Sequence, residues 1–124
     1  MNLNDFDHVI LLAHGSTDPK WKLPFEKIHQ KVLSVTGSDK CSLAYMELSE
    51  PSFETVVESL GAQCTKIAVL PLFFAVGRHL RHDVPKKIEA LQIEGRTIEL
   101  LPPIGDDEKI QQAMVDIVSH HLGN

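Results

Sequence analysis

The chain has 124 residues, enough for one domain with its own core, and its hydrophobic share of 43% with 23% charged residues is ordinary for a soluble globular protein. The formal net charge of −5 argues against nucleic acid as a partner, because nucleic acid requires a basic face. The two cysteines form no CxxC pair, the N-terminus is polar and no apolar run is long enough to span a membrane, so we expect a single cytoplasmic domain over residues 1–124.

The first half of the chain predicts two strands, each followed by a helix. A short apolar, β-branched run predicts a strand at residues 8–13. The turn HGSTDP follows, with Asp18 as a helix cap and Pro19 at the first helical position. Apolar residues then recur every three or four positions, which predicts a helix that begins near Leu23. A second strand is expected at residues 41–46, and a second helix stops at Gly61.

The second half repeats this alternation. A third strand is expected at residues 66–74, followed by a loop at 77–83 dense in titratable and cationic side chains. Because Pro85 disfavours helix at the residue before it, either Asp83 caps the third helix or an earlier turn joins that helix at a bend. A fourth strand is expected at residues 97–101, and the acidic residues 106–108 favour the start of a last helix.

Four strands that alternate with four helices predict an α/β fold. The expected architecture is a four-stranded parallel sheet, doubly wound, with helices on both faces. The doubly wound rule favours the strand order 2-1-3-4. The chain shows no internal repeat and no low-complexity segment.

Titratable side chains follow three of the four predicted strands, namely His14, Glu47 and His79. Since the carboxyl ends of parallel strands lie at one edge of a sheet, these residues can face one cleft. Two imidazoles and a carboxylate suit a weak, open site for a divalent transition metal, and they equally suit acid–base chemistry near pH 7. His82, three residues after His79, is interpreted as a solvated bystander.

Cationic residues accompany these groups at the same predicted edge. Lys20, Arg78 and Arg81 would form a rim suited to a polycarboxylate ligand, although each is also explained as a solvated surface charge. Ser16 is a further candidate for ligand contact, and its position at a helix start also explains it without any role in binding.

At these residues the sequence resembles the small CbiX-type chelatases, class II chelatases that act on sirohydrochlorin. The matching pieces run from Ile10 to about Gly105 in the family's order: LLAHGSTDP with WKLPFE, LAYMELSEPSF, VLPLFFAVGRHLRHDVP and LLPPIG. The resemblance implies a chelatase-like fold and ATP-independent insertion of a divalent metal into a tetrapyrrole of cobalamin or sirohaem biosynthesis. It implies no organic cofactor. The resemblance leaves the metal open, and we expect Co²⁺ as the first substrate, then Fe²⁺ and Ni²⁺.

The resemblance also implies roles for the candidate residues. His14 and His79 become the pair that binds the metal and accepts protons, and Glu47 assists as a ligand or proton relay. Lys20, Arg78, Arg81 and Ser16 become candidates for binding the substrate. The short family members pair as homodimers, so the same pairing is implied here.

Other functions stay open from the sequence. A non-enzymatic tetrapyrrole-binding or metal-delivery protein would use the same cleft, because binding and insertion need the same ligands. The HGS turn also resembles the histidine-phosphatase signature, but the arginine that precedes the histidine there is Ala13 here, which removes the phosphate clamp. A hydrolase with Ser16 as nucleophile would lack the GxSxG elbow.

Overall fold

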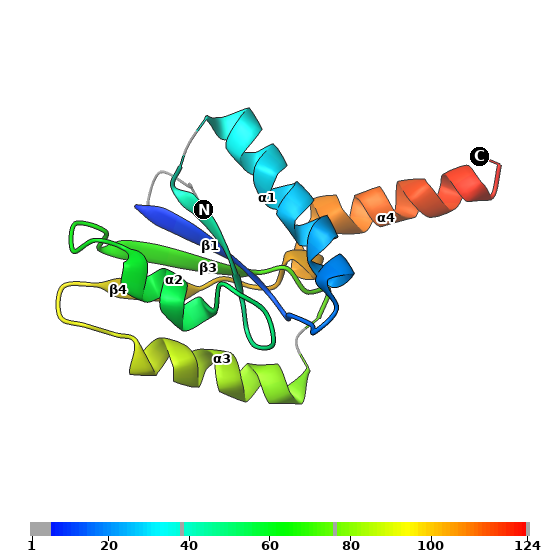
Figure 1. Cartoon of the computed structure of the whole chain (residues 1–124). Helices are drawn as coiled ribbons and strands as arrows, with labels where there is room; N and C mark the ends of the chain where they lie inside the picture. Colours follow the sequence, from blue (N-terminus) through cyan, green and yellow to red (C-terminus); the bar gives the residue numbers. More distant parts are fainter. Residues whose placement is uncertain (1–5, 38, 76, 124) are drawn as a thin grey trace.

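A computed structural model describes residues 6–37, 39–75 and 77–123, without the side chain of His79. Four strands form one parallel sheet in the order β2-β1-β3-β4 (Figure 1). They are β1 (His8–Ala13), β2 (Cys41–Tyr45), β3 (Lys66–Pro71) and β4 (Thr97–Leu100). The predicted α/β fold and strand order are therefore confirmed, although β2, β3 and β4 end one, three and one residues earlier than expected.

A helix follows each strand, and the local sequence sets where most of them start. The helices are α1 (Leu23–Thr36), α2 (Phe53–Ser59), α3 (Arg78–Ala90) and α4 (Glu108–His121), with the 3-10 turns η2 (Pro19–Lys22) and η3 (Ile104–Asp106) before α1 and α4. The side chains of Asp18, Ser52 and Asp107 accept hydrogen bonds from the backbone N–H groups that open η2, α2 and α4. In the described part of the chain, no helix combines the length and apolar character that a membrane span requires.

The expectation of a loop at residues 77–83 is wrong, because α3 already begins at Arg78. An earlier turn therefore joins the helix, which is the second of the two arrangements that Pro85 left open. Leu80, Val84 and Ile88 are spaced by four residues and all three are buried against the sheet. Pro85 has no N–H to donate to the Arg81 carbonyl. Burial of these three side chains offsets the loss of that hydrogen bond.

The two faces of the sheet are packed unequally. On the face of α2 and α3, fourteen of the described residues form one buried cluster that reaches from Ile10 to Ile98. On the opposite face the buried cluster contains four described residues, Leu11, Ala13, Leu43 and Tyr45. Neither α1 nor α4 contributes a buried residue, and α4 runs away from the sheet (Figure 1). The α2 and α3 face of the sheet therefore carries a large buried core, whereas the buried cluster on the opposite face is much smaller.

Polar contacts hold the amino edge of the sheet. The Asp7 carboxylate accepts hydrogen bonds from the backbone N–H groups of Lys66 and Thr65 and from the Thr65 hydroxyl, all at 3.0 Å, and these bonds lower the pKa of Asp7. The Arg96 guanidinium donates to the carbonyls of Cys64, Leu60 and Gly61 at 2.9–3.1 Å, just beyond the C-terminal end of α2. These contacts lie at the edge opposite to the strands' carboxyl ends.

His8 makes the stability of the protein depend on pH in a predictable direction. Its side chain is buried and its Nε2 lies 2.8 Å from the Ser42 hydroxyl. Burial lowers the pKa of His8 below the ordinary value of 6.5, and the Asp39 carboxylate opposes this shift only in part. As the pH falls below about 6.5, the unfolded chain binds a proton at residue 8 before the folded chain does, so stability decreases.

We expect His8→Gln to remove this part of the pH dependence. The free energy of unfolding, measured with urea at pH 7.5 and at pH 5.5, should fall more on acidification in the natural chain than in His8→Gln. Equal decreases in the two proteins would contradict the prediction.

Candidate functional site

The turns that follow β1 and β2 are tied together at the carboxyl edge of the sheet. The backbone N–H of Met46 donates to the Ala13 carbonyl at 2.9 Å, and that of Glu47 donates to the His14 carbonyl at 3.2 Å. The Ser49 hydroxyl donates to the Ser16 carbonyl at 2.7 Å and accepts from the Ser16 N–H at 2.9 Å. Backbone contacts therefore bring His14 and Glu47 into neighbouring turns.

Gly15 permits this close approach. It has a φ of +97°, in the region that side chains disfavour, and a Cβ at this position would lie 1.8 Å from the Glu47 carbonyl oxygen. Any larger residue would force the two turns apart. The close approach of the two turns thus requires glycine at position 15. The HGS motif contains this glycine, but the sequence alone did not show why it is needed.

The His14 side chain is exposed and packs on one side against Phe73. The two ring centroids lie 4.3 Å apart with the ring planes tilted by 42°. Phe73 is buried, and the turn that carries it is tied to β1 by a 2.8 Å hydrogen bond from Leu72 N–H to the Leu12 carbonyl. A buried, anchored ring therefore restricts where the His14 imidazole can lie. Reasoning from the sequence missed Phe73, which was counted only as the end of an apolar strand.

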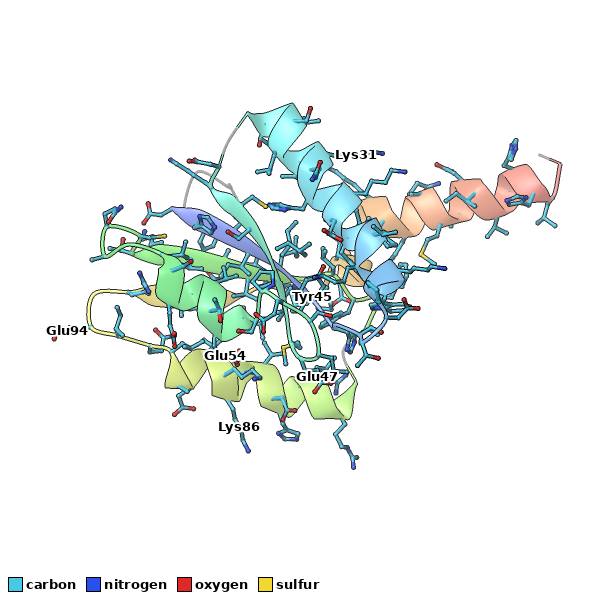
Figure 2. All side chains as sticks on the ribbon, in the orientation of Figure 1. Lys31, Tyr45, Glu47, Glu54, Lys86 and Glu94 are labelled. Carbon is cyan, nitrogen blue, oxygen red and sulfur yellow. The ribbon has the colours of Figure 1, made fainter. Side chains whose placement is uncertain are left out.

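His79 lies in the first turn of α3, and its side chain falls outside the described residues. Gly77 caps this helix without a side-chain hydrogen bond. Because α3 follows β3 along the chain, the N–H groups of its first turn lie at the carboxyl edge of the sheet, where the helix dipole adds partial positive charge. In Figure 2, Glu47 lies at the end of the molecule where α3 begins.

A cavity of about 510 Å³ opens between α3 and the carboxyl ends of β3 and β4. Its walls include Phe73, Leu80 and Pro103, and the charged residues Arg81 and Asp106 lie at its border. Because Phe73 also contacts His14, the cavity and the His14 imidazole share this one aromatic ring. The volume is in the range of sites for organic ligands.

The cationic residues are distributed around this edge. Arg81 borders the cavity, Arg78 is exposed in the first turn of α3, and Lys20 is exposed on η2 after β1. Ser16 is half-buried, and its hydroxyl accepts a 3.1 Å hydrogen bond from the Asp18 N–H, which accounts for its place in the turn. His82 is exposed, as predicted of a solvated side chain, but it lies on α3 and not in a loop.

The turn after β4 packs against the turn after β3. The Gly105 N–H donates to the Phe73 carbonyl at 3.0 Å, and a Cβ on Gly105 would lie 2.1 Å from the Phe74 carbonyl oxygen. The four strand ends are therefore joined into one continuous edge, and α4 starts from it. Within the described residues, no three histidine, cysteine, aspartate or glutamate side chains gather to hold a metal ion.

Comparison with known proteins identifies the family. The CbiX family model matches residues 8–121 of the 124 residues. The chain belongs to the CbiX family. In this respect the resemblance carried by the motifs around His14, Glu47 and His79 is confirmed.

Relatives of this CbiX-family chain match it along most of their length. A sirohydrochlorin cobaltochelatase of Saccharolobus solfataricus is 31% identical over 123 residues, which cover 90% of this chain and 92% of the relative. A sirohydrochlorin cobaltochelatase of Sulfurisphaera tokodaii is 30% identical, with 92% of each chain covered. A solved structure from Marinobacter aquaeolei, described as a cobalamin (vitamin B12) biosynthesis CbiX protein, is 44% identical with a TM-score of 0.80, over 94% of this chain and 97% of that one.

A longer chelatase matches over only part of its chain. The sirohydrochlorin chelatase SirB of Bacillus subtilis, solved in complex with cobalt, is 26% identical with a TM-score of 0.74, and the match covers 91% of this chain and 50% of SirB. The chain therefore corresponds to half of SirB. The chelatase-like fold expected from the sequence is confirmed by these structures.

Proposed function

We propose that this protein inserts a divalent metal ion into sirohydrochlorin, without ATP, with Co²⁺ as its main metal substrate. The observation that carries the proposal is the match to sirohydrochlorin cobaltochelatases over nine-tenths of both chains. The chemistry of the carboxyl edge agrees with it, because an exposed imidazole at His14 and a carboxylate at Glu47 lie in adjacent turns, and Phe73, which contacts that imidazole, lines a cavity. Fe²⁺ and Ni²⁺ are proposed as less favoured substrates.

Metal insertion makes two demands on the protein. Two pyrrole N–H protons must leave the macrocycle, and the metal must lose its water. His14 and His79 hold the metal on one side, each through the single free lone pair of an imidazole, and each ring accepts a pyrrole proton at that nitrogen as it releases the metal to the macrocycle. Glu47 relays a proton or adds a carboxylate ligand. Because the metal must be handed on, a weak and open site suits the reaction better than a closed structural one.

The substrate's carboxylates require cations and N–H groups. We assign the binding of these carboxylates to Arg81 at the cavity border, to Arg78 and the first-turn N–H groups of α3, and to Lys20 on η2. Ser16 is proposed as a further contact. The overall charge of −5 makes this local arrangement necessary, since the protein as a whole repels an anionic substrate.

We also propose that two copies of the chain form the working unit and that the reaction takes place in the cytoplasm. The match to half of SirB supports the first point, because the other half of the SirB chain is about as long as a second copy of this protein. The free thiols of Cys41 and Cys64 support the second, since they suit a reducing compartment.

The test is an anaerobic assay with sirohydrochlorin in large excess over the protein. Co²⁺, Fe²⁺ and Ni²⁺ are added separately, and the absorption of the macrocycle is followed against a control without protein. We expect many turnovers, fastest with Co²⁺. No acceleration with any metal would overturn the chelatase proposal.

Two further outcomes identify the alternatives. Conversion of no more than one equivalent of sirohydrochlorin per protein would favour a tetrapyrrole-binding or metal-delivery protein. Hydrolysis of p-nitrophenyl phosphate that disappears in His14→Ala would favour the histidine-phosphatase function.

A further inference from the structure

Two exposed apolar side chains flank His14 at the carboxyl edge of the sheet. The strand order puts the turn of His14, after β1, between the turns that follow β2 and β3. Leu48 lies in the turn after β2 and Phe74 in the turn after β3, and their side chains are 66% and 67% exposed. Figure 2 shows Glu47, the neighbour of Leu48, at the end of the molecule where α3 begins, a few residues after Phe74. Two large apolar groups therefore meet water on either side of the proposed metal-binding imidazole.

The backbone of Leu48 is strained. Its φ is +65°, and among the described residues it is the one non-glycine residue with a positive φ. A residue with a Cβ disfavours this left-handed region, whereas glycine or asparagine adopts it more readily. Because the Leu48 side chain is mostly exposed, its burial within the chain does not offset this strain. Strain of this kind gathers at binding and catalytic sites, so Leu48 is a candidate for contact with a ligand.

The backbone under both side chains is held in place. Next to Leu48, the Glu47 N–H donates to the His14 carbonyl at 3.2 Å. On the other side, a Cβ on Gly105 would lie 2.1 Å from the Phe74 carbonyl oxygen, so the turn after β4 packs closely on the backbone of Phe74. Each apolar side chain therefore has a fixed point of attachment relative to His14.

The chemistry of the proposed substrate matches this arrangement. Sirohydrochlorin carries its carboxylates around the periphery of a nearly flat ring system, and a metal reaches the ring nitrogens only through the apolar face. To take a metal from His14, the macrocycle must lie with that face over the imidazole, so the groups beside the imidazole meet apolar surface. Neighbouring strands lie about 4.8 Å apart, which separates the turns after β2 and β3 by about 10 Å. One macrocycle can therefore contact both turns.

We propose that Leu48 and Phe74 support the face of the macrocycle on the two sides of His14, while the cations assigned above bind its carboxylates. The inference rests on the proposed chelatase function and adds to it the residues that position the substrate over the metal. Binding removes both apolar side chains from water, which is favourable. The strain and exposure of Leu48 are thus offset in the complex and not in the free protein.

The first test measures binding without metal insertion. The chain has one tryptophan, Trp21, which is 52% exposed on η2 after β1, so quenching of its fluorescence by metal-free sirohydrochlorin gives a Kd. We expect Leu48→Asn and Phe74→Ser each to weaken binding by about 5–30-fold, the change that corresponds to burial of two-thirds of a large apolar side chain. Leu48→Met and Phe74→Leu, which stay apolar, should bind nearly as tightly as the natural chain.

The matched control is Ile93→Asn. Ile93 is 55% exposed in the loop between α3 and β4, at the opposite edge of the sheet, so its replacement should leave the Kd unchanged. An equal weakening in Ile93→Asn would show a general effect of surface polarity and contradict the proposal.

The second test distinguishes substrate contact from a structural role. Because asparagine tolerates a positive φ better than leucine, Leu48→Asn should unfold at the same urea concentration as the natural chain or at a higher one. In turnover with Co²⁺, Leu48→Asn should raise KM and change kcat little, as expected when a contact made equally before and during the reaction is removed. A lower urea midpoint, or a changed sedimentation mass, would assign Leu48 to the fold or to a protein interface and overturn the proposal.

Failure of this inference and failure of the proposed function give different results. Equal Kd values for the natural chain, Leu48→Asn and Phe74→Ser would overturn the inference and leave the chelatase function standing. Weaker binding in these two variants, with no metal insertion by the natural chain, would overturn the chelatase function and support the apolar contacts. A natural chain that does not bind sirohydrochlorin would overturn both.

Discussion

His14→Ala is expected to reduce the rate of metal insertion by about 10²–10⁴-fold, the range that a positioned acid–base group contributes. The imidazole is exposed and packs against the buried Phe73 ring, so its removal takes the proposed proton acceptor from the site without opening the core. The measurement is the initial rate with Co²⁺ and sirohydrochlorin. Thermal unfolding should give nearly the same midpoint as the natural chain, which would separate loss of chemistry from loss of fold.

His82→Ala is the matched control for this experiment. His82 is an exposed histidine on α3, the helix that also carries His79, and its replacement should leave the rate unchanged. His79→Ala is expected to lose activity to a similar degree as His14→Ala. If both His14→Ala and His79→Ala turn over at the natural rate, the site assignment is wrong even where the chelatase activity itself is present.

Gly15→Ala is expected to destabilise the protein by about 3 kcal/mol or more, from two causes that add. A side chain at a φ of +97° costs about 1–2 kcal/mol in the backbone alone. The new Cβ would also lie 1.8 Å from the Glu47 carbonyl oxygen, so the turn must move and the bond from Glu47 N–H to the His14 carbonyl is lost. Unfolding in urea measures the change, and the insertion rate of the remaining folded protein should also fall because His14 and Glu47 separate.

Gly37→Ala isolates the backbone cause. Gly37 ends α1 with a φ of +63°, and a Cβ there would meet nothing within 4 Å. We therefore expect it to lose only the backbone term of about 1–2 kcal/mol, with the insertion rate unchanged. Equal losses in Gly15→Ala and Gly37→Ala would show that the two turns can separate without cost.

The elements of the fold could be predicted where local sequence alone decides them. The apolar run at residues 8–13 and the Asp18–Pro19 helix start have only one reasonable structure, and the alternation of elements then leads to the parallel sheet. The start of α3 could not be decided locally, because Pro85 argues against a helix that the burial of Leu80, Val84 and Ile88 stabilises. Adding Leu80 to the stripe of Val84 and Ile88 would have revealed the earlier turns.

The sequence could predict that the candidate residues lie at the carboxyl edge of the sheet, but it could not predict the side-chain contacts among them. His14 and Glu47 follow neighbouring parallel strands, so topology alone places them in adjacent turns. Phe73 contacts His14 only because β3 pairs with β1, and an aromatic residue in an apolar run carries no signal of such a contact. The outward direction of α4 was equally hidden, because the same apolar stripe would serve a helix packed on its own sheet.

The side-chain contacts of Asp7 and Arg96 stabilise the amino edge of the sheet, whereas the side chains that we propose to bind substrate and metal lie at the carboxyl edge. Side chains at the carboxyl edge, such as Lys20 and Arg78, are exposed and carry little of the folding free energy. Natural selection can therefore exchange them at little risk of unfolding the chain. A scaffold divided in this way has the mutational freedom to acquire a preference for another metal while its fold persists.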